Sequence, residues 1–328
     1  MPRLSVEQRH RIVFMRENGH TVQEISILLG ISRCAVNHTY QRYLDGNGFY
    51  DRPKSGRNCI LSARAQRNLV HLVSAKLFSF SKSGHWAKWK QHEVALKTLK
   101  DEAASKTEFL DEAKIMHSLD NDYLVKLLGV SMNGNQSILC MEFMPKGHLL
   151  GVLKSDKGKN FKLDMLGRMI ASGMSYLSDQ GLIHRDLRTE NVLVNNSYIC
   201  KIADFGLAKK SCVIVLDTKF PVKWTALEAA TQGKFSVKSD VWSYGVLLWE
   251  LVTFGEMPYK GMNGQDVLKN LKTGFRLQIP KEVPHKVPEK WYEQMLMCWD
   301  ENPLNRPNFH SLYDFFEIAF NGPSDYVD

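Results

Sequence analysis

Two short stretches in the second half of the chain, IHRDLRTENVLV and IADFGLA, constrain its fold more than any other feature. The first places Asp186 and Asn191 five residues apart, and the second adds Asp204 eighteen residues after Asp186. Phosphoryl transfer requires little covalent chemistry from a protein, but it requires charge neutralisation on the phosphates and alignment of the attacking hydroxyl. Two acids and an amide can supply both.

This spacing resembles the catalytic loop and the metal-binding motif of protein kinases. The resemblance implies that Asp186 orients and deprotonates the substrate hydroxyl. It implies that Asn191 and Asp204 hold the Mg²⁺ ions that bridge the phosphates of ATP. We therefore expect ATP and Mg²⁺ as cofactors.

The stretch EVALKTLK is predicted to be a strand, and the resemblance gives its Lys97 the task of gripping the α- and β-phosphates of ATP. A helix with a cap at Ser105 follows, in which Glu112 shares one face with Phe109, Ala113 and Met116. A glutamate on an apolar face needs a partner, although taken alone each charge would suit an exposed surface. In this company we expect Glu112 to pair with Lys97.

The nucleotide site follows from the same resemblance. Met141 in LCMEFMPKG falls at the gatekeeper position behind adenine, and the hinge comes directly after it. Before the lysine, the family has a strand and a Gly-x-Gly-x-x-Gly turn, whereas the corresponding stretch KLFSFSKSGHWAKWKQHEV has only one glycine. We therefore expect the first strand and the front of the turn to be replaced, and catalysis to be slowed. The nucleotide-binding residues implied in this way are Lys97, Gly84, Ala95, Met141, Glu142, Met144 and Leu193.

The class of kinase is indicated by the segment KFPVKWTALE, which resembles the tyrosine-kinase form with Pro221 and Trp224 beneath the substrate ring. Arg188 agrees, because serine/threonine kinases usually place lysine there, and we group it with Asp186, Lys97 and Glu112 as catalytic. Glu190 departs from this pattern and resembles the serine/threonine class. Residues 94–320 as a whole resemble Src-like cytoplasmic tyrosine kinases.

The predicted fold class is therefore α+β, a two-lobed protein kinase fold preceded by a small all-α segment. The small lobe is expected at about 76–144, the large lobe at about 145–320 and a tail at 321–328. Glu228 and Arg306 match an ion pair buried in the large lobe. The helix that begins near Asp240 is apolar on nearly every face, which places it in the middle of that lobe.

The N-terminal segment is basic, because residues 1–75 hold eleven Lys or Arg against five Asp or Glu. Capping boxes, a turn at Gly30 and helical periodicity predict a helix-turn-helix over 1–48, followed by a basic linker and partial second helical unit over 49–75. The text resembles the first half of the paired-like DNA-binding region of mariner-type transposases. Side chains suited to reading bases are Arg33, Asn37, His38 and Gln41, and those suited to phosphates are Arg42, Arg52, Lys54 and Arg57.

Composition narrows the cellular setting. The six cysteines contain no CxxC pair, which favours a reducing compartment over a zinc site or a disulfide framework. The start lacks a signal core and a myristoylation glycine, so we expect no membrane anchor. The expected location is the cytoplasm, with the nucleus as the alternative if DNA is bound.

The function predicted from the sequence is an ATP-dependent non-receptor tyrosine kinase acting on protein substrates that bear tyrosine. Weak binding of duplex DNA through residues 1–75 is a further expectation. The alternative is a pseudokinase or scaffolding module with a DNA-binding helix-turn-helix. The single-glycine loop favours this alternative. The intact lysine, glutamate, two aspartates and asparagine oppose that alternative.

Overall fold

The computed structural model divides the chain into two compact units, Met1–Ile60 and Leu61–Asp328. The predicted linker at 49–75, Gly84 and the tail beyond 321 lie outside the described residues. The structure describes residues 12–13, 15–16, 20–44, 78–80, 86–89, 92–100, 103–133, 136–155, 162–210, 213–214, 220–280 and 287–321.

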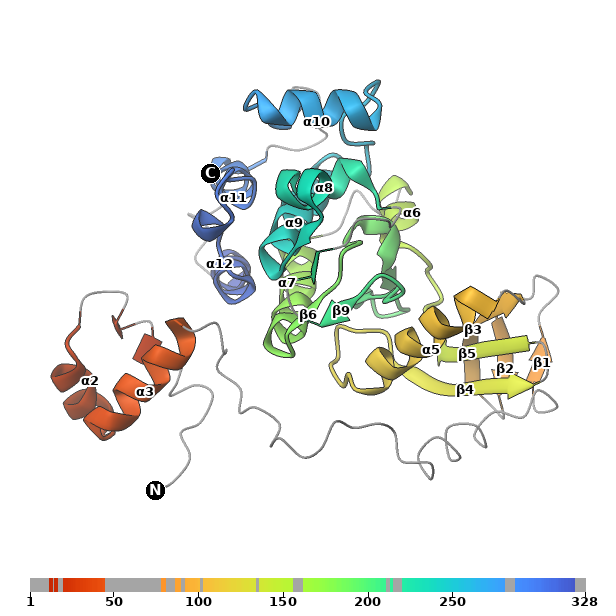
Figure 1. Ribbon diagram of the computed structural model, residues 1–328, viewed down its shortest axis with the longest axis horizontal. Helices are drawn as coiled ribbons and strands as arrows, with labels where there is room; N and C mark the ends of the chain where they lie inside the picture. Colours follow the sequence, from red (N-terminus) through yellow and green to blue (C-terminus); the bar gives the residue numbers. More distant parts are fainter. Residues whose placement is uncertain are drawn as a thin grey trace. The chain divides into compact units, whose positions relative to one another are not determined.

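The N-terminal unit contains helices α2 (Val22–Leu29) and α3 (Arg33–Leu44), shown at the red end of Figure 1. The backbone N–H of Thr21 donates to Glu24 Oε2 at 2.8 Å, and the N–H of Glu24 donates to Thr21 Oγ1 at 3.2 Å. Gly30 ends α2 in the left-handed region at φ 63°, which a glycine adopts without steric cost. The capping box predicted at Thr21 and the turn predicted at Gly30 are confirmed, while the other predicted capping box lies outside the described residues.

A small apolar core holds this unit together. Ile12, Ile25, Ile31 and Val36 are buried and in contact, with Leu29 packed against them. Leu28, three residues after Ile25, is 65% exposed, so the inward face of α2 continues through its i+4 neighbour Leu29 instead. The bundle is small, and its stability depends on these few contacts.

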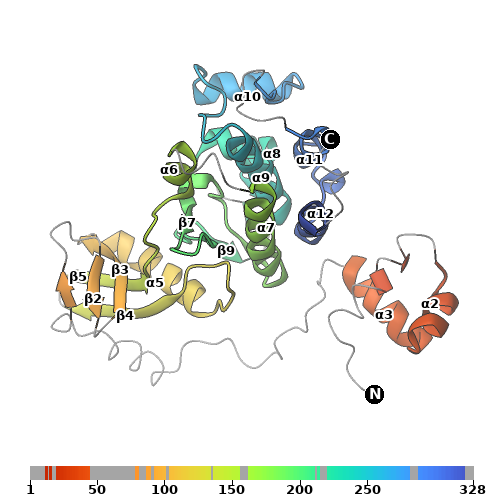
Figure 2. The same ribbon diagram turned by 180° about the vertical axis from the view of Figure 1, so that it is seen from behind.

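The small lobe is a five-stranded antiparallel sheet with one helix, α5 (Ala103–His117), packed on it (Figures 1 and 2). The strand order is β1-β2-β3-β5-β4. The expectation that the first strand is replaced is wrong, because Phe78 pairs with Trp89 and Phe80 with Ala87. The strands are β1 (Phe78–Phe80), β2 (Trp86–Trp89), β3 (His92–Lys100), β4 (Leu127–Asn133) and β5 (Gln136–Glu142).

Helix α5 covers the sheet through Phe109 and Ala113, which contact Val130 and Leu139. The helix begins at Ala103, two residues before the predicted cap at Ser105. All four residues predicted to share its inward face are at most 5% exposed, including the glutamate among them. A carboxylate is therefore held inside an apolar contact surface.

The large lobe is mostly helical (Figure 1). Its helices are α6 (Leu149–Lys154), α7 (Leu163–Asp179), α8 (Leu227–Gln232), α9 (Val237–Val252), α10 (Gly264–Lys272), α11 (Glu289–Cys298) and α12 (Phe309–Asn321). Short strands pair as β6 (Leu182–Ile183) with β9 (Lys209–Lys210), β7 (Val192–Val194) with β8 (Cys200–Ile202), and β10 (Val213–Ile214) with β11 (Lys234–Phe235). Single 3₁₀ turns are η3 (Thr189–Asn191), η4 (Val222–Trp224) and η5 (Pro303–Asn305).

Helix α9 is the centre of the large lobe. Every residue from Ser239 to Val252 is buried, and Ser236 caps the helix by accepting from the N–H of Ser239. The prediction of a helix buried on all faces is confirmed. Because its whole circumference is covered, polar side chains on α9 must find partners inside the protein.

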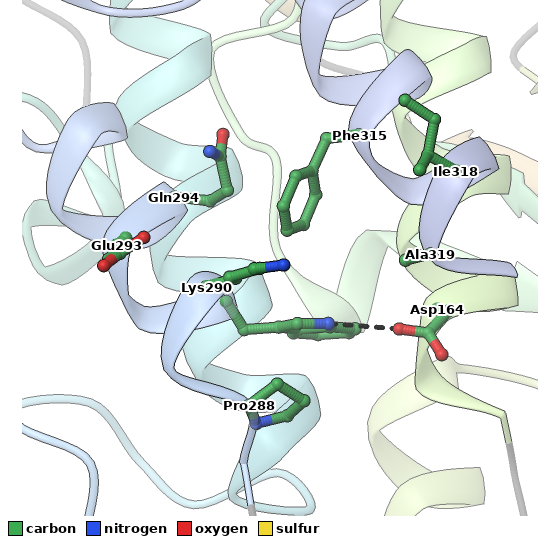
Figure 3. A pocket seen from close by; sticks show the side chains of 9 residues that line it. Asp164, Pro288, Lys290, Glu293, Gln294, Phe315, Ile318 and Ala319 are labelled. Atoms are coloured by element: carbon green, nitrogen blue, oxygen red, sulfur yellow. Dashed lines mark hydrogen bonds between the residues drawn. The ribbon is translucent and has the colours of Figure 1, made fainter. Parts of the chain in front are cut away.

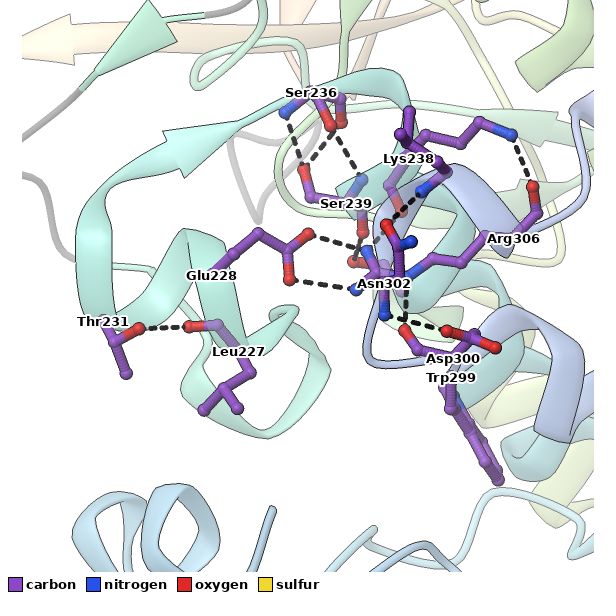
Figure 4. Close-up of polar contacts among 12 residues, drawn as sticks. Leu227, Glu228, Thr231, Ser236, Lys238, Ser239, Trp299, Asp300, Asn302 and Arg306 are labelled. Atoms are coloured by element: carbon purple, nitrogen blue, oxygen red, sulfur yellow. Dashed lines mark hydrogen bonds and ion pairs between the residues drawn. The ribbon is translucent and has the colours of Figure 1, made fainter. Parts of the chain in front are cut away.

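Glu228 and Arg306 form the predicted ion pair (Figure 4). Arg306 Nη1 and Nη2 donate to the two carboxylate oxygens of Glu228 at 2.6 and 2.9 Å. Arg306 also donates to the carbonyls of Lys238 and Asp300, and its guanidinium lies 5.0 Å from the ring centroid of Trp242. The arginine thereby joins α8, α9 and the segment before α12.

Across the part of the chain that the structure describes, no helix combines the length and the apolar character needed to span a bilayer.

Candidate active site

Lys97 is the point at which three elements meet. Its ammonium lies 2.8 and 2.9 Å from the two oxygens of Glu112 on α5, and 3.0 Å from Asp204 Oδ1 in the loop after β8. A Cβ on Gly206 would lie 3.4 Å from Asp204 Oδ1 and 3.8 Å from Lys97 Nζ. A methyl group at this position would make ordinary van der Waals contacts with the charged cluster.

The charges in this cluster are strongly coupled. Burial opposes the charge on Lys97, but Glu112 and Asp204 outweigh burial and raise the pKa of the ammonium. Burial raises the pKa of Glu112, while the two Lys97 contacts favour its ionised form. Burial also disfavours the charge on Asp204, yet Lys97, His184 and the N–H of Gly206 together lower its pKa. We conclude that the lysine carries its charge between two carboxylates.

The loop between β6 and β7 carries Asp186 and Asn191. The side-chain amide of Asn191 donates from Nδ2 to the carbonyl of Asp186 at 2.8 Å, which leaves the oxygen Oδ1 of the amide as an acceptor. Burial raises the pKa of Asp186, while Arg188 and Asn191 oppose that rise. Asp186 Oδ1 is buried, and among the described residues it faces Arg188 Nε at 3.1 Å without an aligned hydrogen bond.

The shape of this loop is fixed from beneath by Asp240 of α9. Its carboxylate accepts from the N–H of His184 at 2.7 Å and from the N–H of Arg185 at 2.9 Å. Arg185 has φ 70°, a left-handed conformation that is unfavourable for a side chain of this size. Burial raises the pKa of Asp240 to about 6, and the two backbone donors favour its ionised form.

Arg188 lies between two carboxylates. Its Nη1 is 2.6 Å from Glu190 Oε2, and its Nε is 3.1 Å from Asp186 Oδ1. The guanidinium is also 5.5 Å from the ring centroid of Trp224. The structure thus brings the predicted catalytic arginine to the catalytic loop and to the predicted peptide segment together.

Glu250 of α9 was not predicted to belong to this site. It is 2% exposed, and it accepts from the N–H and the hydroxyl of Thr189 at 3.1 and 2.7 Å and from Trp224 Nε1 at 3.0 Å. Burial raises the pKa of Glu250 to about 7 despite these donors. A glutamate within the apolar run WSYGVLLWELV was the signal that could have identified it.

The described nucleotide residues of the prediction lie on β3, β5 and β7 and in the segment just after β5. Ala95 pairs with Met141 across the sheet, Met144 is 4% exposed, and Leu193 is partly buried on β7. The carboxylate of Glu142 points to Lys201 of β8, whose ammonium donates at 2.6 and 2.9 Å. The side chain of this hinge residue is therefore engaged by the large lobe.

The donor set suits the predicted metal. Asn191 offers an amide oxygen, and the Asp204 side chain is 49% exposed with an ionised carboxylate. Oxygen ligands from one or two acidic or amide side chains are what Mg²⁺ prefers in nucleotide sites. The residues present therefore fit the group.

A separate hollow of about 400 Å³ lies on the large lobe between α7, α11 and α12 (Figure 3). Asp164 accepts from Trp291 Nε1 at its edge at 3.1 Å, and Phe315 and Ile318 form part of its wall. None of the residues that line it belongs to the predicted catalytic, nucleotide or metal set. The hollow is distinct from the candidate active site.

In the N-terminal unit, helix α3 presents a polar face. Arg33, Asn37, His38 and Gln41 are all exposed, while Val36 on the opposite side is fully buried. Residues 33, 37 and 41 follow one another at one-turn intervals. The predicted base-reading residues therefore share an exposed stripe, and the predicted phosphate contacts at 52, 54 and 57 lie outside the described residues.

The family model described as protein tyrosine and serine/threonine kinase matches residues 74–316. The chain belongs to this family. A homeodomain-like domain model matches residues 3–52. The kinase match begins ahead of β1, in agreement with the presence of the first strand.

Two curated relatives are both Src-type tyrosine kinases by name. The chain is 43% identical to the tyrosine-protein kinase Src64B of Drosophila melanogaster over 243 residues, which are 71% of this chain and 43% of that protein. It is 42% identical to the tyrosine protein-kinase src-1 of Caenorhabditis elegans over 268 residues, 77% of this chain and 49% of that protein. The chain thus spans less than half the length of either relative.

These comparisons confirm the predicted resemblance to Src-like tyrosine kinases and the α+β kinase fold behind a helix-turn-helix segment. The mariner-type character of that segment and the exact domain boundaries stay predictions.

Proposed function

We propose that this chain is an active non-receptor tyrosine kinase that transfers the γ-phosphate of ATP to tyrosine in proteins. The observation that carries the proposal is the convergence of Lys97 on Glu112 and Asp204 within 3.0 Å, next to the loop that bears Asp186. A lysine fixed between two carboxylates has its ammonium oriented before any nucleotide arrives. Such preorganisation is what electrostatic catalysis requires.

Each residue then has a defined task. Lys97 grips the α- and β-phosphates, and Glu112 holds its ammonium in place. Asn191 and Asp204 hold Mg²⁺, which neutralises negative charge on the phosphates when bound. Asp186 accepts the proton of the tyrosine hydroxyl at its carboxylate, and its place in the loop beside Asn191 supports this role.

The nucleotide base is proposed to lie among Ala95, Met141, Met144 and Leu193, with the hinge backbone at Glu142 as its polar partner. Gly84 is proposed to contact the phosphates. If the loss of two of the family's three glycines removes two charge-assisted backbone bonds to the phosphates, each lost bond is worth about 1.5–3 kcal/mol. The expected cost is a kcat/KM lower by roughly 10²–10⁴.

The choice of tyrosine over serine or threonine rests on Pro221, Trp224 and Arg188. The ring of Trp224 is held by Glu250 and lies beneath Arg188, so the platform for a large aromatic side chain is rigid. Both relatives are tyrosine kinases by name. The substrates are therefore proposed to be proteins that expose tyrosine.

The test is phosphotyrosine formation by the full chain on a mixed tyrosine and serine peptide library with ATP and Mg²⁺. Asp186→Asn should abolish transfer by removing the base, and Lys97→Met should abolish it by loosening the phosphates. Full activity in either variant contradicts the roles proposed here.

The alternative is a pseudokinase that scaffolds other proteins. A thermal shift upon addition of ATP and Mg²⁺, without phosphotyrosine from any peptide, would select that alternative.

A second activity, duplex DNA binding, is proposed for the N-terminal unit because α3 carries the exposed stripe of Arg33, Asn37 and Gln41. The full chain should bind duplex DNA weakly, with an affinity that falls steeply with salt if about four to six phosphates are contacted. Arg33→Ala should weaken binding. Affinity that is independent of salt, or no binding at low salt, contradicts this activity.

A cytoplasmic location is proposed together with the kinase activity, and a nuclear one together with DNA binding.

A further inference from the structure

Arg188 divides its guanidinium unequally between its two carboxylate neighbours. The shorter contact, 2.6 Å, runs from Nη1 to Glu190 Oε2. The contact from Nε to Asp186 Oδ1 is 3.1 Å, but within the described part of the chain both of these buried atoms lack an aligned hydrogen bond. The arginine therefore lies against Oδ1 without forming an aligned pair with the carboxylate.

An arginine beside a single carboxylate usually forms a two-pronged pair, in which both oxygens accept from the planar fork. Such a pair at Asp186 would engage Oδ2 as well as Oδ1 and leave neither oxygen for the tyrosine hydroxyl. Glu190 provides the competing anion that withdraws Nη1 from that geometry. The Glu190 side chain is 46% exposed and that of Asp186 is 13% exposed, so the competing carboxylate is the more exposed of the two.

The place of Glu190 is fixed by its backbone. Its carbonyl accepts from His148 Nδ1 on the segment before α6, and the residue lies within the η3 turn. On the other side the guanidinium faces the ring of Trp224. Arg188 is thus restrained by a ring on one side and by a fixed carboxylate on another.

We propose that Glu190 is a positioning residue that holds Arg188 back from a two-pronged pair with Asp186 and so keeps the catalytic carboxylate open to the tyrosine hydroxyl. The inference rests on the proposed kinase function and adds a device to the same site. It concerns the residue at which the sequence departs from the tyrosine-kinase pattern. Glu190 acts through Arg188 and does not touch the reacting atoms.

The decisive experiment is a double-mutant cycle on the full chain, with kcat and both KM values measured on a tyrosine peptide. Glu190→Gln keeps the size of the side chain and removes its charge, so Arg188 turns to Asp186 as the remaining anion. We expect kcat to fall roughly 10- to 100-fold, the effect of one charge-assisted hydrogen bond gained by the wrong partner, with the KM for ATP unchanged. Glu190→Asp retains the charge and should recover part of the loss.

The cycle is completed by Arg188→Ala, which lowers activity in its own right. In that background Glu190→Gln should cause no further loss of kcat, because there is no arginine left to restrain. Glu256→Gln is the matched control, since Glu256 is also a half-exposed glutamate paired with a basic residue, Lys260 at 3.4 Å, and its loss should leave kcat unchanged.

Three outcomes overturn the inference. An unchanged kcat in Glu190→Gln shows that Arg188 needs no restraint. Independent, multiplicative losses in the double variant, or a rise in peptide KM alone, assign Glu190 to direct contact with the substrate. A chain that forms no phosphotyrosine before any substitution overturns the proposed function, and this inference with it, so the two failures are distinguishable.

Discussion

Replacing Arg306 with methionine should destabilise the kinase unit more than any single change at its surface. The Arg306 side chain is 0% exposed and that of Glu228 is 16% exposed, so the ion pair is largely desolvated. Methionine keeps an unbranched stem above Trp242 but removes all the donors. Glu228 is then left as a buried carboxylate without its partner, and the carbonyls of Lys238 and Asp300 lose a donor each.

The magnitude follows from these contacts. Removal of one partner of a buried ion pair costs about 3–5 kcal/mol. Each carbonyl that loses its donor adds about 1 kcal/mol, although the terms are not fully additive because they share one guanidinium. A total of about 4–6 kcal/mol is comparable with the whole stability of a typical domain, about 5–15 kcal/mol. The corresponding fall in Tm is roughly 10–20 °C.

The assay is urea unfolding of the full chain followed by tryptophan fluorescence. All seven tryptophans lie beyond residue 75, so the signal reports the kinase unit alone. Lys114→Met is the control, because the Lys114–Asp111 pair is exposed by 57% and 43% and should contribute less than about 1 kcal/mol. A loss in Arg306→Met no larger than in this control would refute the reasoning, since it would mean that the buried carboxylate is satisfied in some other way.

Three further changes have defined outcomes. Burial raises the pKa of Glu250 from an ordinary value of 4.5 to about 7, so the folded state holds the proton of this carboxyl more tightly than the unfolded state does. As pH rises from 5 to 8, the unaltered chain should therefore lose stability relative to Glu250→Gln, by up to about 3 kcal/mol in urea unfolding. Gly245→Ala should lower the free energy of unfolding by about 1–3 kcal/mol in the same assay, because the added Cβ would lie 2.6 Å from Trp299 Nε1. Gly151→Ala in α6 is the control, since its Cβ would meet nothing within 4 Å and the change should be neutral or stabilising. Thr21→Ala should cost the N-terminal unit about 1 kcal/mol through loss of the α2 cap, measured as faster amide hydrogen exchange in that helix.

The pairs that the sequence predicted correctly are those whose members belong to dense motifs. Lys97 with Glu112, and Glu228 with Arg306, are separated by 15 and 78 residues, yet each member stands in a stretch that identifies it. Periodicity also placed Glu112 on the buried face of α5. In these cases the local sequence pattern and the motif predicted the same pairing.

The contacts that the sequence did not predict join single residues across long separations. Glu250 reaches Thr189 and Trp224, and Lys201 reaches Glu142. The partners stand in recognised motifs, but nothing in those motifs identifies Glu250 or Lys201 as the residue that pairs with them. A charged residue inside an apolar run indicates only that a partner exists, because burial of a charge requires one. Which residue serves as that partner depends on how α9 and β8 pack.

The first strand was missed for a different reason. The alternation Phe78-Ser79-Phe80 is a period-two pattern, but three residues are too few to distinguish a strand from a linker. The strand forms because β2 offers it a paired edge, as in the register of Phe78 with Trp89. Pairing with β2 therefore determined the secondary structure of a segment whose own sequence was compatible with either a strand or a linker.

The support that Asp240 gives the catalytic loop has a consequence for biosynthesis. The loop residues His184 and Arg185 are made first, and the carboxylate that binds their N–H groups is 56 and 55 residues further along the chain. Until the ribosome has released α9, the left-handed turn at Arg185 has no partner to offset its strain. Since chains are synthesised at about 5–20 residues per second, the nascent loop spends seconds without its support. We therefore expect the loop geometry to form only after synthesis has passed this motif, and a chain truncated between Asp204 and Asp240 would contain every proposed catalytic side chain but lack the carboxylate that supports the loop.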